Sequence, residues 1–83
     1  MTDHGDRKLL VREPPQYTPA LVRRVRERLD LSVSTFGAVL GVSEVTIRSW
    51  EAGQRNPDRV ARRLLQIAEA APELLLALAQ LPV

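Results

Sequence analysis

Residues 32–50 read Ser-Val-Ser-Thr-Phe-Gly-Ala-Val-Leu-Gly-Val-Ser-Glu-Val-Thr-Ile-Arg-Ser-Trp. Ser32 and Ser43 each precede a run with apolar residues at helical spacing, so each serine is expected to cap a short helix. Gly41 follows the first run, where a glycine adopts the left-handed conformation that ends a helix. The stretch therefore predicts two short helices joined by a tight turn.

The apolar side chains of this helix pair are expected to point inward. They are Phe36, Val39, Leu40, Val42, Ile47 and Trp50. Gly37 lies inside the first helix, although glycine there costs about 1 kcal/mol relative to alanine. Its presence predicts a close approach of the next helix that leaves no room for a larger side chain.

Helices are also predicted on both sides of the pair. Thr18 and Pro19 form a helix start, and apolar residues follow at helical spacing at Leu21, Val22, Val25 and Leu29. A fourth helix begins with Asn56 or Asp58 as its cap and ends at Pro72. Its expected inward positions are Val60, Leu64, Ile67, Ala68 and Ala71. A fifth helix is expected over residues 73–81, which makes the fold class all-α.

The chain before Thr18 is predicted to be an extended arm. The pair Pro14-Pro15 forbids a helix there. Residues 1–17 are therefore expected to be an N-terminal arm that is partly disordered or forms a short strand, which could pair with a partner chain. Residues 18–83 are expected to form the folded domain, with the last helix used for dimerisation.

Composition excludes several classes of function. The 83 residues include no cysteine and a lone histidine, His4, so no metal site and no cofactor are expected. Paired carboxylates, Cys/His pairs and phosphate loops are also missing, which argues against an enzyme. Polar residues and Pro72 interrupt the apolar region 64–83, which argues against a membrane span. The sequence thus predicts a soluble cytoplasmic protein.

Charge is distributed unevenly along the chain. The net charge is +2, and all twelve basic residues lie between Arg7 and Arg63. The last twenty residues carry only Glu69 and Glu73 as charged groups. Because phosphates attract arginine and lysine, the basic part is suited to nucleic acid and the apolar end to protein.

Two short helices joined by a tight turn are typical of a DNA-reading element. The second helix of the pair would then present its outward face to the major groove of DNA. With Ile47 and Trp50 facing the core, the predicted base-contacting residues are Glu44, Val45, Arg48 and Ser49. Arg48 can donate two hydrogen bonds to guanine, Val45 can pack on a thymine methyl group, and Glu44 can accept from cytosine. The alternative for each residue is an ordinary solvated helix face.

Phosphate contacts are expected from helix N-termini and from the loop after the second helix of the pair. The predicted residues are Ser32, Val33 through its backbone amide, Thr35, Ser43, Gln54, Arg55 and Asn56. Arg55 is the strongest of these candidates because it lies in a polar loop directly after the helix that would read the bases. The arginines at positions 23, 24 and 28 are expected only to keep their helix face soluble.

The last predicted helix is apolar in nearly every direction around its axis. A domain of this size has little interior in which to bury such a helix. A homodimer is therefore expected, with packing onto the chain's own helices as the alternative. The predicted interface residues are Leu74, Leu75, Leu78 and Leu81.

Residues 18–71 resemble the Xre-like, Cro-repressor type helix-turn-helix family. The resemblance rests on Leu31-Ser32, Phe36-Gly37, Leu40-Gly41-Val42-Ser43, Thr46-Ile47, Trp50-Glu51-Ala52-Gly53 and Pro57. It implies a compact five-helix, lambda-repressor-like DNA-binding domain that binds palindromic operators in double-stranded DNA as a dimer. It also implies an ion pair between Arg26 and Glu51; the alternative is two independent surface charges.

Within this family, the arrangement of arm, domain and leucine-rich last helix is most similar to antitoxins of type II toxin–antitoxin modules. The resemblance implies a repressor of its own operon that neutralises a RelE-like ribonuclease toxin. Candidate toxin-binding surfaces are the arm at 7–17 and the acidic residues Glu69 and Glu73. Val33 stands where the family has a phosphate-binding glutamine, so a protein-interaction adaptor without DNA reading is an alternative, as is a free-standing Xre-type regulator.

Overall fold

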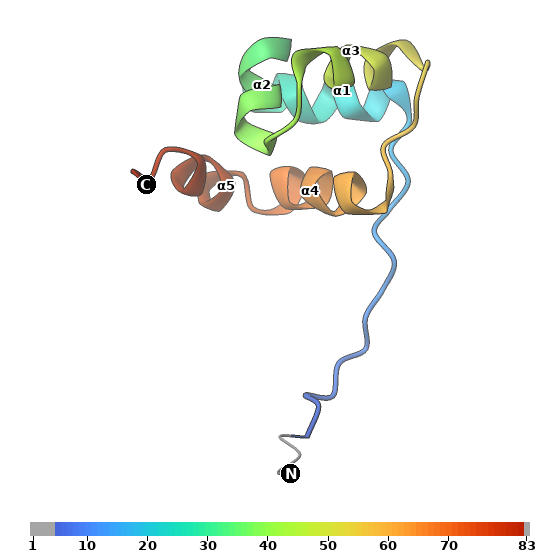
Figure 1. The fold of residues 1–83 in the computed structure, drawn as a ribbon, viewed down its shortest axis with the longest axis vertical. Coiled ribbons are helices and arrows are strands. Elements are labelled where there is room, and N and C mark those ends of the chain that lie inside the picture. Colours follow the sequence, from blue (N-terminus) through green and yellow to red (C-terminus); the bar gives the residue numbers. More distant parts are fainter. Residues whose placement is uncertain (1–4, 83) are drawn as a thin grey trace.

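The computed structural model describes residues 5–82, and His4 lies outside this range. Within it the chain forms five helices and no strand (Figure 1). The all-α expectation is confirmed. The helices are α1 (Pro19–Arg28), α2 (Val33–Leu40), α3 (Glu44–Ala52), α4 (Arg59–Ala70) and α5 (Pro72–Ala79).

Side-chain caps begin the first four helices at the residues that the sequence indicates. The hydroxyls of Thr18, Ser32 and Ser43 each accept a hydrogen bond from the backbone amide three residues later. Asp58, not Asn56, caps α4 by accepting from the amide of Ala61 at 2.8 Å. Each cap satisfies an amide that has no partner inside its helix.

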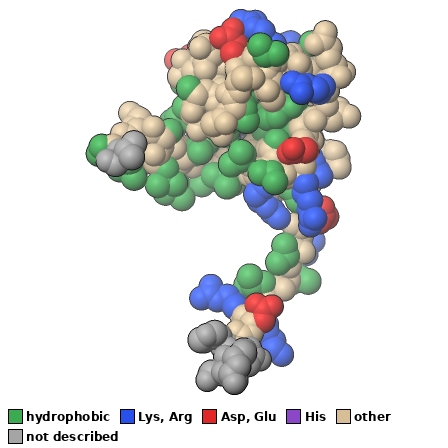
Figure 2. Space-filling view, in the orientation of Figure 1, with side chains coloured by type: hydrophobic (Ala, Val, Ile, Leu, Met, Phe, Trp, Pro, Cys, Tyr) green, Lys and Arg blue, Asp and Glu red, His purple; other side chains and the backbone are tan. Residues whose placement is uncertain are grey.

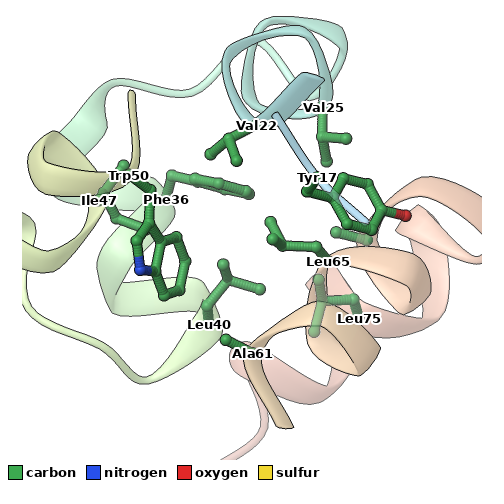
Figure 3. Close-up of a cluster of buried hydrophobic side chains, with 11 residues drawn as sticks. Tyr17, Val22, Val25, Phe36, Leu40, Ile47, Trp50, Ala61, Leu65 and Leu75 are labelled. Carbon is green, nitrogen blue, oxygen red and sulfur yellow. The ribbon is translucent and has the colours of Figure 1, made fainter. Parts of the chain in front are cut away.

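The helices form two layers. Helices α1, α2 and α3 lie on one side and α4 and α5 on the other, with the apolar core between them (Figures 1 and 3). The largest fully buried side chains are Val22, Phe36, Ile47 and Leu65. Burying a side chain of this kind stabilises a fold by roughly 1.5–3 kcal/mol. Since these side chains come from α1, α2, α3 and α4 in turn, the core joins the two layers.

Gly37 has the packing role that its position predicts. A Cβ atom at Gly37 would lie 2.8 Å from the carbonyl oxygen of Val42 and 3.3 Å from the carbonyl carbon of Ser43. Both atoms belong to the backbone that leads into α3. Gly41 ends α2 with φ of 80°, as expected for the tight turn. The two glycines together set how closely α3 follows α2.

The predicted inward face of α4 is only partly correct, since Ala68 is buried and Leu64 packs partly buried against the core. Val60 and Ile67 are 71% and 37% exposed, whereas Ala61, Leu65 and Ala68 are buried. Two neighbouring rows of apolar residues run along this helix, and the row with the small alanines faces the core. Helical spacing alone could not distinguish the two rows.

The junction between the last two helices also differs from expectation. Helix α4 ends at Ala70, and Pro72 begins α5 instead of only ending α4. Proline is suited to the first helical position because its missing N–H group needs no partner there. Helix α5 then ends at Ala79, two residues before the predicted end.

The segment before α1 is held against α4 by side chains of that helix. The guanidinium groups of Arg62 and Arg63 donate to the backbone carbonyls of Pro14 and Arg12, each at 2.7 Å. Arg59 pairs with the carboxylate of Glu13. These three arginines of α4 therefore organise the arm.

Tyr17 anchors the end of the arm in the core. The residue is 6% exposed, and its hydroxyl donates to the Glu69 carboxylate at 2.7 Å. Burial and this hydrogen bond raise the pKa of Tyr17. Residues 5–11 extend away from the body of the molecule on the α4 side (Figure 1). None of the helices described within residues 5–82 is long and apolar enough to cross a membrane.

Candidate nucleic-acid interface

Helix α3 is oriented as the sequence predicts. Ile47 is fully buried and Trp50 is 5% exposed, so these side chains hold one face of α3 in the core. On the other side, Val45 is 67% exposed and the side chain of Arg48 is 64% exposed. The outward face of α3 thus presents an apolar surface and a guanidinium group to solvent.

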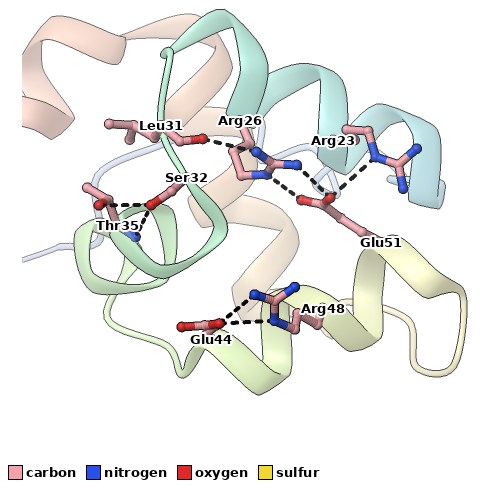
Figure 4. A network of polar contacts seen from close by, with 8 residues as sticks. All are labelled: Arg23, Arg26, Leu31, Ser32, Thr35, Glu44, Arg48 and Glu51. Atoms are coloured by element: carbon pink, nitrogen blue, oxygen red, sulfur yellow. Dashed lines mark hydrogen bonds and ion pairs between the residues drawn. The ribbon is translucent and has the colours of Figure 1, made fainter.

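Glu44 and Arg48 form an ion pair along this outward face (Figure 4). The Nη2 and Nε atoms of Arg48 both donate to the same Glu44 oxygen, Oε2, at 2.6 and 3.0 Å. An exposed pair one helical turn apart stabilises a helix by only about 0.3–0.5 kcal/mol. Arg48 can therefore exchange this partner for a base at small cost.

Ser49 is a correction to the predicted base-contacting set. It is 8% exposed, whereas Glu44, Val45 and Arg48 are exposed. Its backbone belongs to the end of α3, where the amides of Gln54 and Arg55 donate to the Ser49 carbonyl at 3.0 and 3.3 Å. A small side chain at the border of the outward face is covered by its neighbours, so it cannot reach a groove.

At the start of α2, two hydroxyl groups are coupled. The Ser32 hydroxyl accepts from the Thr35 amide and donates to the Thr35 hydroxyl, each at 3.1 Å. The Thr35 hydroxyl consequently keeps its own proton for an external acceptor such as a phosphate. Val33 is half-buried against the core, which leaves its backbone amide at the helix start as its polar group.

The start of α3 has a similar arrangement. The Ser43 hydroxyl accepts from the Thr46 amide at 3.0 Å, and the two hydroxyls lie 2.8 Å apart. At the other end of α3, Gln54, Arg55 and Asn56 are all exposed. The structure thus places the predicted phosphate-contacting residues at both ends of α3 and at the start of α2.

The ion pair between Arg26 and Glu51 that the resemblance implies is present. Arg26 donates from Nε to Glu51 Oε2 at 2.7 Å and from Nη2 to Oε1 at 2.9 Å. The two side chains are 16% and 8% exposed. Arg26 also donates from Nη1 to the Leu31 carbonyl at 3.0 Å. This arginine therefore ties α1 both to α3 and to the turn before α2.

The same contacts shift the ionisation of both groups. The hydrogen bonds from Arg26 lower the pKa of the Glu51 carboxyl, although burial opposes this effect. The bonds to Glu51 likewise raise the pKa of Arg26. Because both groups remain charged at neutral pH, the link between α1 and α3 is a charged one.

Arg23 has a place in the site that sequence reasoning missed. Its Nε atom lies 3.4 Å from Glu51 Oε1, although the residue was expected only to keep α1 soluble. Arg23 stands three residues before Arg26, which puts the two on successive turns of one helix side. That spacing is the signal that could have identified it.

The predicted dimer face is only partly exposed. Leu74, Leu78 and Leu81 are 58%, 56% and 63% exposed. Leu75 is a correction, because it is buried at 9% exposure in the core of its own chain. Figure 2 shows apolar side chains gathered along the α4 and α5 side of the molecule.

Comparison with known proteins agrees with this geometry. Residues 20–78 match the family model described as a helix-turn-helix domain. The chain belongs to this helix-turn-helix domain family. In this class of domain, the second helix of the motif lies in the major groove of DNA. The motif corresponds here to α2 and α3, and the protein carries a DNA-binding domain.

A curated relative of this helix-turn-helix domain is Antitoxin HigA-2 from Vibrio cholerae serotype O1. The two sequences are 31% identical over 64 residues, which cover 77% of this chain and 62% of the relative. The chain thus spans less than two thirds of the length of the curated relative it matches.

Proposed function

We propose that this protein is a sequence-specific transcriptional repressor that binds a palindromic operator as a homodimer. The observation that carries the proposal is the orientation of α3. Burial of Ile47 and Trp50 leaves Val45 and Arg48 exposed on the opposite face of the helix that enters the major groove in this family.

The three exposed residues on this face have complementary roles. Arg48 donates two hydrogen bonds to a guanine, and Val45 packs against a thymine methyl group. Glu44 accepts from a cytosine amino group once Arg48 has left it for a base. A bidentate arginine–guanine contact contributes about 1–3 kcal/mol of discrimination, which exceeds the weak ion pair that it replaces.

Contacts to the phosphates of the DNA backbone set the position of α3 in the groove. The donor on Thr35 and the exposed side chain of Arg55 are suited to phosphates on either side of the bases. Because such contacts carry no sequence information, they contribute affinity and not discrimination. Ser43, Gln54 and Asn56 would assist at the ends of α3.

Dimerisation is supported by Leu74 and Leu78. These two leucines lie one helical turn apart on α5 and are both more than half exposed. A two-fold related copy would cover them and would present a second α3 to the other half of a palindrome.

Antitoxin function is the more specific part of the proposal. It is supported by the similarity to Antitoxin HigA-2 and by an arm that α4 holds without using the α3 face. In this role the protein would repress its own operon and neutralise a ribonuclease toxin. Co-purification with the product of the adjacent gene tests it, and an adjacent gene that encodes no toxin contradicts it.

Duplex selection from a random pool, followed by affinity measurements, tests DNA reading. We expect the wild type to enrich a palindromic sequence. Arg48→Ala should lose about 1–3 kcal/mol of discrimination at one base pair of each half-site, whereas Arg55→Ala should weaken all duplexes equally. Unchanged base preference in Arg48→Ala would contradict the assignment. No enrichment by the wild type would favour the adaptor alternative, in which the half-buried Val33 replaces a phosphate-binding residue.

A further inference from the structure

A hollow with charged residues around it lies between α1 and α3 beside the proposed base-reading residues. It has a volume of about 270 Å³ and is lined by Arg23, Arg48, Glu51 and Ala52. Arg48 and Ala52 are one turn apart on the exposed side of α3. The hollow therefore opens on the face of the molecule that would meet DNA.

Two arginines share the carboxylate of Glu51 at this hollow, and they do so unequally. Glu51 is 8% exposed and already accepts two short hydrogen bonds from Arg26, at 2.7 and 2.9 Å. Arg23 reaches the same carboxylate through Nε alone, at 3.4 Å, and its side chain is 53% exposed. The single negative charge of Glu51 is thus shared by two cations, and Arg23 is the outer and more weakly held one (Figure 4).

The remaining N–H donors of Arg23 are available to an external acceptor. Among residues 5–82, neither terminal nitrogen of its guanidinium group makes a hydrogen bond to the protein. An arginine has five N–H donors and is always charged. Arg23 can therefore keep its contact with Glu51 and donate to a second anion at the same time.

Resting on the proposed function, we infer that Arg23 binds a backbone phosphate of the duplex that α3 reads. The ligand is a phosphodiester group next to the bases contacted from α3. The contact comes from α1, outside the helix-turn-helix motif. It would bind α1 to the DNA, whereas Arg26 binds α1 to α3. Phosphate contacts of this kind fix register and orientation.

Salt-dependent binding measurements test this inference. The probes are the duplex enriched by the wild type and a scrambled duplex of equal length. Arg23→Ala is expected to weaken binding to both and to reduce the slope of log affinity against log salt by about 0.9 per bound subunit. Arg23→Lys should restore most of the slope, because a phosphate accepts a point charge.

Arg24→Ala is the matched control, since it removes the same charge from the next position of α1, outside the hollow. We expect it to leave the slope unchanged. If circular dichroism shows that both proteins are folded, equal slopes for the wild type and Arg23→Ala overturn this inference and leave the proposed function standing. An equal loss in Arg23→Ala and Arg24→Ala also overturns it, because general charge would then be sufficient. Absence of specific binding by the wild type overturns the proposed function and this inference with it.

Discussion

At the scale of single residues, Glu51 holds the α3 face in position. Its carboxylate accepts hydrogen bonds from Arg26 and Arg23 on α1, and Arg26 extends the connection to the Leu31 carbonyl. One buried charge thereby links α1, the turn before α2, and α3. Glu51 lies beside Arg48, one of the residues proposed to read bases, since the two line the same hollow.

Replacement of Glu51 by glutamine should cost stability in a pH-dependent way. We expect Glu51→Gln to lower the free energy of unfolding by about 1–3 kcal/mol at neutral pH, because Arg26 loses its charged partner. The folded pKa of Glu51 lies below its ordinary value of 4.5. The contribution is therefore complete above about pH 5 and is lost as pH falls through the folded pKa. Denaturant unfolding between about pH 3 and 7 measures it.

The matched control is Glu73→Gln, which removes an exposed carboxylate from α5. Its unfolding free energy should stay within about 0.5 kcal/mol of the wild type. If the wild type and Glu51→Gln differed by the same amount at every pH, the charged form of Glu51 would not be the source of the stability.

The sequence could not predict the burial and contacts of residues at the border of a helix face. Ile47 and Trp50 are bulky and apolar and stand three residues apart on one side of α3, so their burial follows from the local pattern. Ser49 and Arg23 are different, because neither is large and apolar. Ser49 is buried although its side chain is small and polar. Arg23 lies beside Glu51 only because α1 packs on α3, which brings together residues 28 positions apart in the sequence.

At the scale of elements, α4 and α5 show how a helix with several apolar rows is resolved. The alanines of α4 allow close approach to the other layer, which selects the row of Ala61, Leu65 and Ala68 for the core. Helix α5 contributes Leu75 to the same core and leaves Leu74 and Leu78 exposed. Helix α5 thus has one apolar side in the core of its own chain and a second apolar side that faces solvent.

Substitutions on the two sides of α5 should separate folding from association. Leu75→Ala should destabilise each subunit by about 2–5 kcal/mol, because it leaves a cavity in the core. Leu78→Ala should change subunit stability by less than about 1 kcal/mol and should weaken the proposed dimer. Sedimentation measures association, and denaturant unfolding at low protein concentration measures subunit stability. A fully dimeric Leu74→Ala/Leu78→Ala double variant would refute the assigned interface.

At the scale of the whole molecule, the two layers separate the arm from the α3 face. Helices α1 to α3 form the layer that carries the candidate interface, and the arm, which leads directly into α1, runs past α4 and extends away on that side (Figure 1). Arg62 and Arg63 fix the arm to that second layer through backbone carbonyls. A partner bound to the arm would therefore leave the α3 face accessible.

Removal of residues 1–11 should leave duplex affinity and its salt dependence unchanged. The deleted segment lies on the side away from α3 where it is described, and its formal charges cancel, since it contains Asp3, Asp6, Arg7 and Lys8. The contacts of Arg12, Glu13 and Tyr17 remain in the shortened protein. Titration of the selected duplex at several salt concentrations checks this, with Arg55→Ala as the weakened control. A reduced salt slope would mean that the arm reaches DNA phosphates.

The sequence by itself determined the local structure of this protein. Capping residues, Gly41 and the spacing of Phe36, Ile47 and Trp50 specify two helices, a turn and an outward face, because each depends on neighbours within one or two turns. Only the tertiary structure decided which row of α4 is buried, that Leu75 belongs to the core, and that Arg23 joins the site. The physical reason is that these outcomes depend on packing between helices, where several arrangements satisfy the same local pattern.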